Sequence, residues 1–132
     1  MNEGRLSLRL LLDTHIFLWL AADDKRLSEA ARRSISDASR VLISSASILE
    51  IAIKFRIGKL KVDPDDALAE IAANGFEELP IRNDHAVRVG RLPLHHRDPF
   101  DRLLVAQAIS ERLHLLTADA QLKAYSDLVI LV

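Results

Sequence analysis

Five short apolar runs, separated by stretches of helical length, constrain the fold of this chain more than any other feature. The runs are LRLLLD (8–13), VLIS (41–44), FEELPI (76–81), HLLTAD (114–119) and LVILV (128–132). Several are apolar at successive positions, which is typical of strands buried on both faces of a parallel sheet. Between them, amphipathic stretches such as SEAARRSISDAS (28–39) and SASILEIAIKF (45–55) predict helices.

This alternation predicts an α/β fold with a mostly parallel central sheet. Because the crossover between parallel strands is almost always right-handed, we expect helices on both faces and a three-layer α/β/α sandwich. The 132 residues suit a single domain over 1–132. A chain of this size can bury a sizeable core without disulfide or metal staples.

The absence of cysteine narrows the classes of site that the chain can build. It excludes disulfides, thiolate zinc sites and cysteine nucleophiles, and it suits a cytoplasmic location. The net charge of −1 gives no global attraction to nucleic acid. Near the N-terminus, LSLRLLLDTHIFLWLAA (6–22) contains Arg9, Asp13 and His15, so it predicts a strand and a helix rather than a membrane span.

Two aspartates stand at the ends of predicted strands. Asp13 ends the first apolar run and Asp119 ends the fourth. In open parallel sheets, ligands bind beyond the carboxyl ends of the strands, at the point where the strand order reverses. The two aspartates would meet there if the first and fourth strands were neighbours, and this is the arrangement that gives both acids a common use.

Each of these acids also has a purely structural interpretation. Asp13 and Asp119 fit the N-caps of the helices that follow them. Asp98 fits that role better, because Pro99 would take the first helical position. Asp101 would then stand at the third position, where a carboxylate interacts favourably with the helix dipole.

Glu50 lies in the stretch 45–55, which is apolar nearly all round and is therefore expected to be largely buried. A buried carboxylate needs a partner or a metal, and Lys54, four residues on, is one such partner. Several carboxylates on one rim of a sheet would repel each other without a cation. Hard oxygen ligands in a chain without cysteine indicate Mg²⁺ or Mn²⁺ rather than zinc.

Four blocks follow one another along the chain and together span most of it. They are LLLDTHIFLW (10–19), SSASILEIAIKFRIGKL (44–60), LPLHHRDPFDRLLVAQA (92–108) and LLTADAQLKAY (115–125). In this order and spacing they resemble PIN-domain proteins, and more narrowly the VapC-type toxin ribonucleases of bacterial toxin–antitoxin pairs. The resemblance implies a PIN-like fold and a magnesium-dependent endoribonuclease that hydrolyses RNA phosphodiester bonds, leaving a 5′-phosphate and a 3′-hydroxyl.

The same resemblance gives both metal binding and catalysis to four acids: Asp13, Glu50, Asp101 and Asp119. In the family's third block the metal-binding acid begins the DRLLVAQA helix, so Asp101 matches it and Asp98 is expected to cap the helix. Some relatives carry a further acid after the fourth block. Here Ala120 and Gln121 stand in that region, so a fifth ligand is not predicted.

The residues around Asp98 and Asp101 have open roles. His95, His96 and Arg97 either contact substrate phosphates or lie in an exposed loop. Arg102 either neutralises a phosphate or pairs with Asp98. No histidine is required as a catalytic base, since a metal-bound water can supply the nucleophile.

Side chains beside the first and fourth acids are expected to support them. Thr14 and Thr117 are candidate hydrogen-bond donors to those acids, and His15 is expected to pack or to form hydrogen bonds. Aromatic residues make up only 5% of the chain, so a stacking platform for single-stranded nucleic acid is not predicted. Recognition of RNA would then depend on its shape and on a local basic rim.

The toxin resemblance implies an RNA substrate, a small VapB-like antitoxin, a homodimer and no membrane. Phe17, Trp19 and Ile51 are candidates for protein contacts, although core packing is the simpler interpretation of each. A non-catalytic metal-stabilised binding module and a DNA-directed nuclease of the same fold stay open. A receiver-like phosphoacceptor domain does not fit, because the third and last strands end in ELPI and VILV instead of the required aspartate and lysine.

Overall fold

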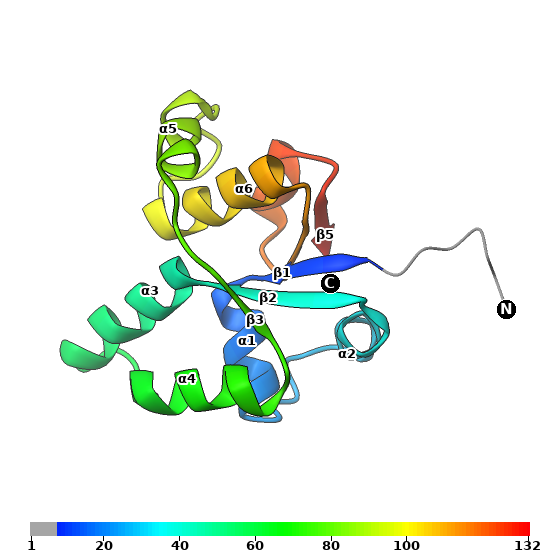
Figure 1. The fold of residues 1–132 in the computed structure, drawn as a ribbon, viewed down its shortest axis with the longest axis vertical. Coiled ribbons are helices and arrows are strands. Elements are labelled where there is room, and N and C mark those ends of the chain that lie inside the picture. The colour runs from blue at the N-terminus through cyan, green and yellow to red at the C-terminus, as the bar shows by residue number, and fades with distance from the viewer. Residues whose placement is uncertain (1–7) are drawn as a thin grey trace, which may run out of the picture.

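A five-stranded sheet forms the centre of the molecule in a computed structural model that describes residues 8–132 (Figure 1). The strands are β1 (Arg9–Leu12), β2 (Arg40–Ser44), β3 (Glu77–Leu79), β4 (His114–Thr117) and β5 (Val129–Leu131). Their order is β3-β2-β1-β4-β5, and every neighbouring pair is parallel. All five predicted strands are therefore present, each within two residues of its expected bounds.

Helices make every connection between the strands within residues 8–132. They are α1 (Thr14–Ala21), α2 (Glu29–Asp37), α3 (Ser45–Arg56), α4 (Pro64–Ala73), α5 (Asn83–Arg91), α6 (Pro99–Glu111) and the 3₁₀ helix η1 (Ala120–Tyr125). Several begin at side-chain caps supplied by the sequence. Ser28 accepts a hydrogen bond from the amide of Ala31 at the start of α2, and Asp63 caps α4 ahead of Pro64.

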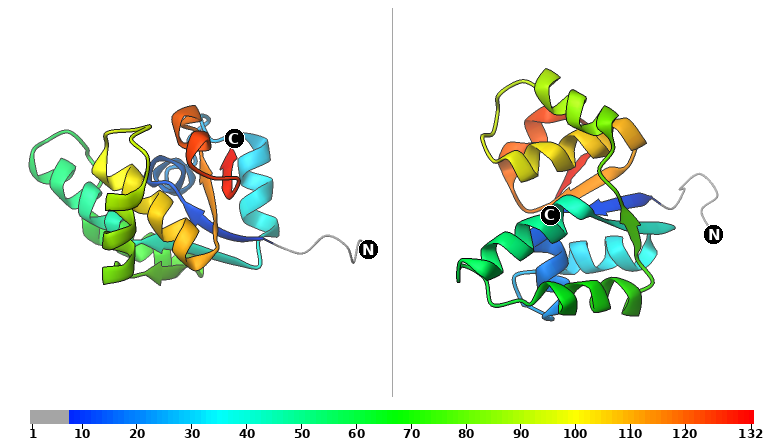
Figure 2. Two further views of the ribbon diagram at one scale, coloured as in Figure 1. Left: turned by 90° about the horizontal axis from the view of Figure 1, so that it is seen from above. Right: turned by 60° about the vertical axis from the view of Figure 1, so that its left-hand side comes forward.

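The alternation of side chains along the strands divides the core into two halves. Leu10 and Leu12 of β1 pack with residues of α1, α2, α3 and α4, whereas Leu11 packs on the opposite face with residues of α6 and η1. α5 lies outside α6 and packs against it. Figures 1 and 2 show the resulting three layers, which confirm the predicted α/β/α sandwich.

The order of the strands reverses at β1. The chain runs from β1 outward to β2 and β3, and then returns to place β4 on the other side of β1. Leu10, Leu11 and Leu12 pair with His114, Leu115 and Leu116. The predicted contact between the first and fourth strands is confirmed, and it places the ends of both strands at one reversal point, where ligands of such sheets bind.

One helix differs from its expected burial. In α3 the side chains of Ser47, Glu50 and Ile51 are buried, but Leu49 and Ile53 are 50% and 43% exposed. The expectation of a largely buried helix was wrong, because only the sides of α3 that face the sheet, α4 and α6 are covered.

Two of the three residues proposed as protein contacts are buried in the core of this chain instead. Phe17 and Ile51 lie in the core, whereas Trp19 is only partly buried. Phe17 and Ile51 are therefore committed to the core of this chain. Within residues 8–132, the helices are too short or too polar for any of them to cross a lipid bilayer.

Candidate metal centre

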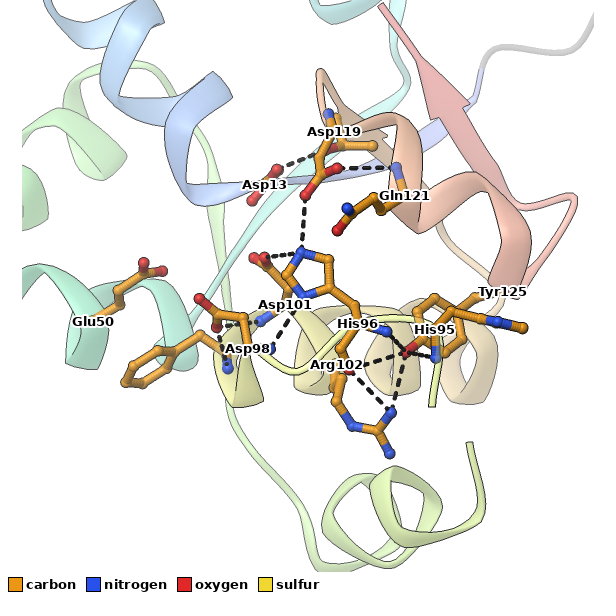
Figure 3. Close-up of polar contacts among 12 residues, drawn as sticks. Asp13, Glu50, His95, His96, Asp98, Asp101, Arg102, Asp119, Gln121 and Tyr125 are labelled. Atoms are coloured by element: carbon orange, nitrogen blue, oxygen red, sulfur yellow. Dashed lines mark hydrogen bonds and ion pairs between the residues drawn. The ribbon is translucent and has the colours of Figure 1, made fainter. Parts of the chain in front are cut away.

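Five acids gather beyond the carboxyl ends of β1 and β4. Figure 3 shows the side chains of Asp13, Glu50, Asp98, Asp101 and Asp119 around one region, contributed by the end of β1, by α3, by the start of α6 and by the start of η1. The four acids predicted as metal ligands are thus brought together, and Asp98 lies beside them. Their side chains differ in burial and in hydrogen bonding, and these differences separate their possible roles.

Asp13 is a buried carboxylate with one free oxygen. Its side chain makes no cap of α1, although the residue occupies the N-cap position. Oδ2 accepts a hydrogen bond of 2.6 Å from the hydroxyl of Thr117, as expected for a supporting donor. Oδ1 is buried and has no hydrogen-bond partner among the described residues. Burial raises the pKa of Asp13 above its usual value, so the ionised carboxylate is disfavoured unless a positive charge lies nearby.

Glu50 has a similar arrangement on α3. The residue is 3% exposed, and its Oε2 accepts a 2.6 Å hydrogen bond from Nζ of Lys54. The pair between Glu50 and Lys54 is confirmed, but its carboxylate end is buried. Oε1 is buried and unpartnered within residues 8–132. A buried carboxylate oxygen without a hydrogen bond is costly, so it needs a ligand that the protein does not supply itself.

Asp98 and Asp101 have different roles at the start of α6. Oδ1 of Asp98 accepts hydrogen bonds from the amides of Phe100 and Asp101, at 2.8 and 3.2 Å. Pro99 follows at the first helical position, so the predicted cap is confirmed. The carboxylate of Asp101 makes no cap and is directed to the acids instead (Figure 3).

Asp101 has the most perturbed acidity of the cluster. Burial, followed by the charge of Asp13 and then by the charges of three other acids, raises the pKa of Asp101 to about 8. The other three are Asp98, Glu50 and Asp119. Both burial and the neighbouring negative charges therefore disfavour the ionised form of Asp101 in the metal-free protein. A bound cation would remove the repulsion.

His96 joins the cluster, which the sequence left undecided. Its Nε2 lies 3.0 Å from Oδ2 of Asp119 and 3.4 Å from Oδ2 of Asp101. Its Nδ1 accepts a 3.0 Å hydrogen bond from the amide of Asp98, so the proton of the neutral ring is on Nε2. His96 therefore donates a hydrogen bond to Asp119, and the same nitrogen lies 3.4 Å from Oδ2 of Asp101 (Figure 3).

Asp119 combines a cap with a place in the cluster. Its Oδ1 accepts a 2.9 Å hydrogen bond from the amide of Gln121 at the start of η1, while its Oδ2 accepts a hydrogen bond from Nε2 of His96. Its own amide donates to Oγ1 of Thr117, the same hydroxyl that donates to Asp13. Thr117 therefore connects the acids at the ends of β1 and β4. One oxygen of Asp119 therefore caps η1, and the other contacts His96 within the cluster.

The loop that carries His96 is fixed by Arg102 and Tyr125. Arg102 donates to the carbonyl oxygens of Val89 and Pro93, both at 2.9 Å, and to the hydroxyl of Tyr125 at 3.1 Å. That hydroxyl also accepts the amide of His96 at 2.9 Å. Of the two roles predicted for Arg102, pairing with Asp98 is not seen, because its guanidinium is directed to the preceding loop and to Tyr125.

Four further predicted side chains take different positions. The ring of His95 contacts the ring of Tyr125, with centroids 4.9 Å apart, and Arg97 is exposed. Thr14 is buried, and its hydroxyl donates to Ser47 at 2.8 Å, so the side chain of Thr14 supports α3 rather than Asp13. His15 is exposed and lines a hollow beside Asp13 and Asp119.

The donor set fits a hard divalent cation. Carboxylate oxygens predominate, and two of them are buried and unpartnered among the described residues. One carboxylate oxygen each of Asp101 and Asp119 and one ring nitrogen of His96 also lie within 4.8 Å of one another. Oxygen ligands of this kind suit Mg²⁺ or Mn²⁺.

A second group, Asp84, His85 and Glu111, also meets a simple distance test for metal ligands among the described residues. Both ring nitrogens of His85 are already used there, since Nδ1 accepts the amide of Arg82 and Nε2 lies 2.8 Å from Glu111. This second group is therefore a structural contact between α5 and α6.

Comparison with known proteins agrees with this architecture. The PIN domain model matches residues 10–128. Ribonuclease VapC22 of Mycobacterium tuberculosis is 29% identical over 118 residues, which are 88% of this chain and 91% of that protein.

Solved structures show the same fold. VapBC2 from Rickettsia felis, bound to a DNA fragment from its promoter, has a TM-score of 0.66 at 16% identity and covers 95% of this chain and 98% of that one. VapC20 of M. tuberculosis, described as a toxin that cleaves the Sarcin-Ricin loop, has a TM-score of 0.61 at 17% identity, with 89% and 97% covered. From the match over residues 10–128, together with the reversal point and its acids, the chain belongs to the PIN domain family.

Proposed function

We propose that this protein is a divalent-metal-dependent endoribonuclease and the toxin of a toxin–antitoxin pair. The observation that carries the proposal is the pair of buried, unpartnered carboxylate oxygens, Asp13 Oδ1 and Glu50 Oε1. They lie in a cluster where burial first, and then the charges of neighbouring acids, raise the pKa of Asp101 to about 8. Membership of the PIN domain family and the likeness to Ribonuclease VapC22 support RNA as the substrate.

Four acids would hold the ion: Asp13, Glu50, Asp101 and Asp119. When bound, Mg²⁺ or Mn²⁺ would polarise the scissile phosphodiester and supply a water of lowered pKa near neutral pH. The protein provides the rest of the arrangement. Thr117 fixes one oxygen of Asp13 and leaves the other free, and Lys54 does the same for Glu50.

His96 offers a proton donor at the edge of the same cluster. Because the amide of Asp98 fixes its tautomer, the Nε2 proton is presented to the carboxylates of Asp101 and Asp119. With a cation bound by those carboxylates, the Nε2 proton of His96 would be placed to donate to a phosphate oxygen of the substrate. The products expected for hydrolysis in this class are a 5′-phosphate and a 3′-hydroxyl.

The proposed partners follow from the relatives. Solved structures with this fold include toxin–antitoxin complexes from Rickettsia felis and Klebsiella pneumoniae, so we propose a VapB-like antitoxin as the protein partner. We also propose a homodimer and a cytoplasmic location, as the toxin class implies.

The test compares the wild type with Asp101→Asn, which removes the ligand charge with little change of volume. Each protein is induced separately in cells, and new RNA 5′ ends are mapped across the transcriptome. We expect 5′-monophosphate ends at discrete sites with the wild type alone, and the same cuts by purified protein only when Mg²⁺ or Mn²⁺ is present. Asp127→Asn, at an exposed acid outside the cluster, is the matched control and should cut as the wild type does.

Two outcomes would contradict the proposal. Cleavage of DNA but not RNA by the purified wild type would make the protein a nuclease of a different substrate class. Metal binding without cleavage of either nucleic acid would instead indicate a binding module stabilised by the ion.

A further inference from the structure

A hollow adjoins the acid cluster on the side of α1. It is lined by Asp13, His15, Trp19, Arg26, Ala118 and Asp119, and it has a volume of about 380 Å³. This volume falls within the roughly 300–1,000 Å³ that is usual for small-molecule sites. Two of the proposed metal ligands thus form one wall of a space whose other walls have no part in holding the ion.

Flat side chains make up those other walls. The rings of His15 and Trp19 have centroids 6.1 Å apart at an interplanar angle of 47°, and Cζ of Arg26 lies 5.3 Å from the centroid of Trp19. Trp19 is partly buried and packs against the core, so its ring is held in place. The low aromatic content predicted no stacking platform, yet the only tryptophan of the sequence is at this site.

Arg26 is an exposed side chain whose guanidinium is paired with the carboxylate of Asp24. Its Nε and Nη2 donate to the carboxylate of Asp24, with the shortest contact 2.7 Å, and its own amide donates to the same carboxylate at 2.9 Å. The Arg26 guanidinium in turn lowers the pKa of Asp24 to about 2. With its charge balanced in this way, Arg26 offers the plane of its guanidinium, a surface on which nucleobases stack.

The charges of the hollow select which part of a nucleotide it can take. Asp13 and Asp119 repel a phosphate group unless a cation lies between them and the phosphate. A nucleobase is flat and uncharged, so it gains stacking from His15, Trp19 and Arg26 without that repulsion. The phosphate of the same nucleotide then belongs at the acid cluster.

We propose that this hollow binds a nucleobase of the RNA next to the scissile phosphate, stacked against Trp19, and so contributes to the choice of cleavage site. This base site rests on the proposed function in one respect, because it assumes that the substrate is RNA. Its test is a binding measurement, which gives an answer whether or not the protein cuts RNA.

The single tryptophan makes the measurement direct, because its fluorescence reports on this hollow alone. The wild type is titrated in Mg²⁺ with adenosine, guanosine, cytidine and uridine 5′-monophosphates, which contain no bond for the nuclease to cut. Ribose 5-phosphate, which has the phosphate but no base, is the control ligand. We expect saturable quenching by one or more of the nucleotides and none by ribose 5-phosphate. Equal quenching by ribose 5-phosphate, or no saturable quenching by any nucleotide, would overturn the proposal.

Variants locate the binding by calorimetry with the tightest nucleotide. Trp19→Ala should weaken binding about tenfold, as expected for loss of a stacking partner, and Trp19→Phe should retain most of the affinity. Because Trp19 also packs against the core, His15→Ala is tested beside it and should weaken binding too, since it removes an exposed ring of the hollow. Phe55→Ala, at a 40% exposed ring outside the hollow, should bind as the wild type does.

The two proposals can fail separately. If RNA is cut but Trp19→Ala and His15→Ala bind nucleotides as the wild type does, the base site is wrong and the proposed function stands. If nucleotides quench the fluorescence of Trp19 but the wild-type protein does not cut RNA even with Mg²⁺ or Mn²⁺, the proposed function is wrong. The hollow then stands as a nucleobase site.

Discussion

At the scale of single residues, two aspartates three positions apart have different surroundings. The carboxylate of Asp98 is satisfied by two amides of its own helix, whereas that of Asp101 lies among four other acids. An N-cap needs only an acceptor, and asparagine supplies one as well as aspartate does. A position among metal ligands needs the negative charge. Substitutions that separate charge from hydrogen bonding can therefore tell the two roles apart.

For Asp98 we predict that Asp98→Asn keeps stability and cleavage near the wild-type values. Asp98→Ala removes the acceptor for the amides of Phe100 and Asp101 and should lower the free energy of unfolding by about 1 kcal/mol. Urea denaturation and an RNA cleavage assay check both variants. Loss of cleavage in Asp98→Asn equal to that in Asp101→Asn would show that Asp98 is also a ligand.

For His96 we predict a stability loss that depends on metal. His96→Ala removes the Nε2 donor between Asp101 and Asp119, so in EDTA the free energy of unfolding should fall by about 1–2 kcal/mol. In saturating Mg²⁺ the loss should be smaller, because the cation then separates the carboxylates. Thermal melts with and without metal measure the difference, with His95→Ala as the control at the neighbouring exposed ring. An equal loss in both conditions would mean that His96 has only a packing role.

At the scale of elements, α6 positions the site through both its start and its side. Its first residues carry Asp101, and Arg102 in the same turn fixes the loop before it through the carbonyls of Val89 and Pro93. Tyr125 of η1 joins this arrangement through its hydroxyl. One helix thus holds its own carboxylate and also the loop that brings His96 to the cluster.

Arg102→Lys should loosen that loop while the sheet stays intact. A lysine keeps the charge but cannot reproduce the separate donors to the loop carbonyls and to Tyr125. We expect faster amide hydrogen exchange over residues 92–98, unchanged exchange in β1 and β4, and weaker metal binding. Arg33→Lys on α2, an exposed arginine away from the site, is the matched control. Unchanged exchange over 92–98 in Arg102→Lys would show that the loop is held by other contacts.

The elements also show what the sequence could predict. Apolar runs located all five strands, and the pattern Asp98-Pro99 located the start of α6, because these signals are local. The face that α3 exposes and the direction of Arg102 depend on which helix packs beside which, so no local pattern contained them. His96 was left undecided for the same reason, since its contact with Asp119 joins residues 23 positions apart.

At the scale of the whole molecule, the acid cluster makes stability depend on pH. The pKa of Asp101 is raised from 3.8 to about 8 in the folded protein. Between these values the folded state holds a proton that the unfolded state has released. The stability of the metal-free protein therefore falls as the pH rises through this window, by up to about 1.4 kcal/mol for each pH unit. The raised pKa of Asp13 acts in the same direction.

We predict that urea denaturation in EDTA gives a lower free energy of unfolding at pH 8 than at pH 5, and that Asp101→Asn removes most of the difference. Addition of Mg²⁺ at pH 8 should restore stability, by about 2.7 kcal/mol when the free ion is at 100 times its dissociation constant. The metal affinity itself should rise with pH, because binding displaces the proton of Asp101. A pH slope that is the same in wild type and Asp101→Asn would place its origin in other groups.

The pairing of β1 with β4 has a consequence for folding during synthesis on the ribosome. Asp13 and the hydroxyl of Thr117 that supports it are 104 positions apart in the chain. Contacts of such high sequence separation form late and slowly in folding, and a chain leaves the ribosome N-terminus first. β1 therefore emerges from the ribosome long before β4 and Asp119. The acid cluster cannot assemble until β4 has been made, so a growing or truncated chain that lacks β4 does not carry it.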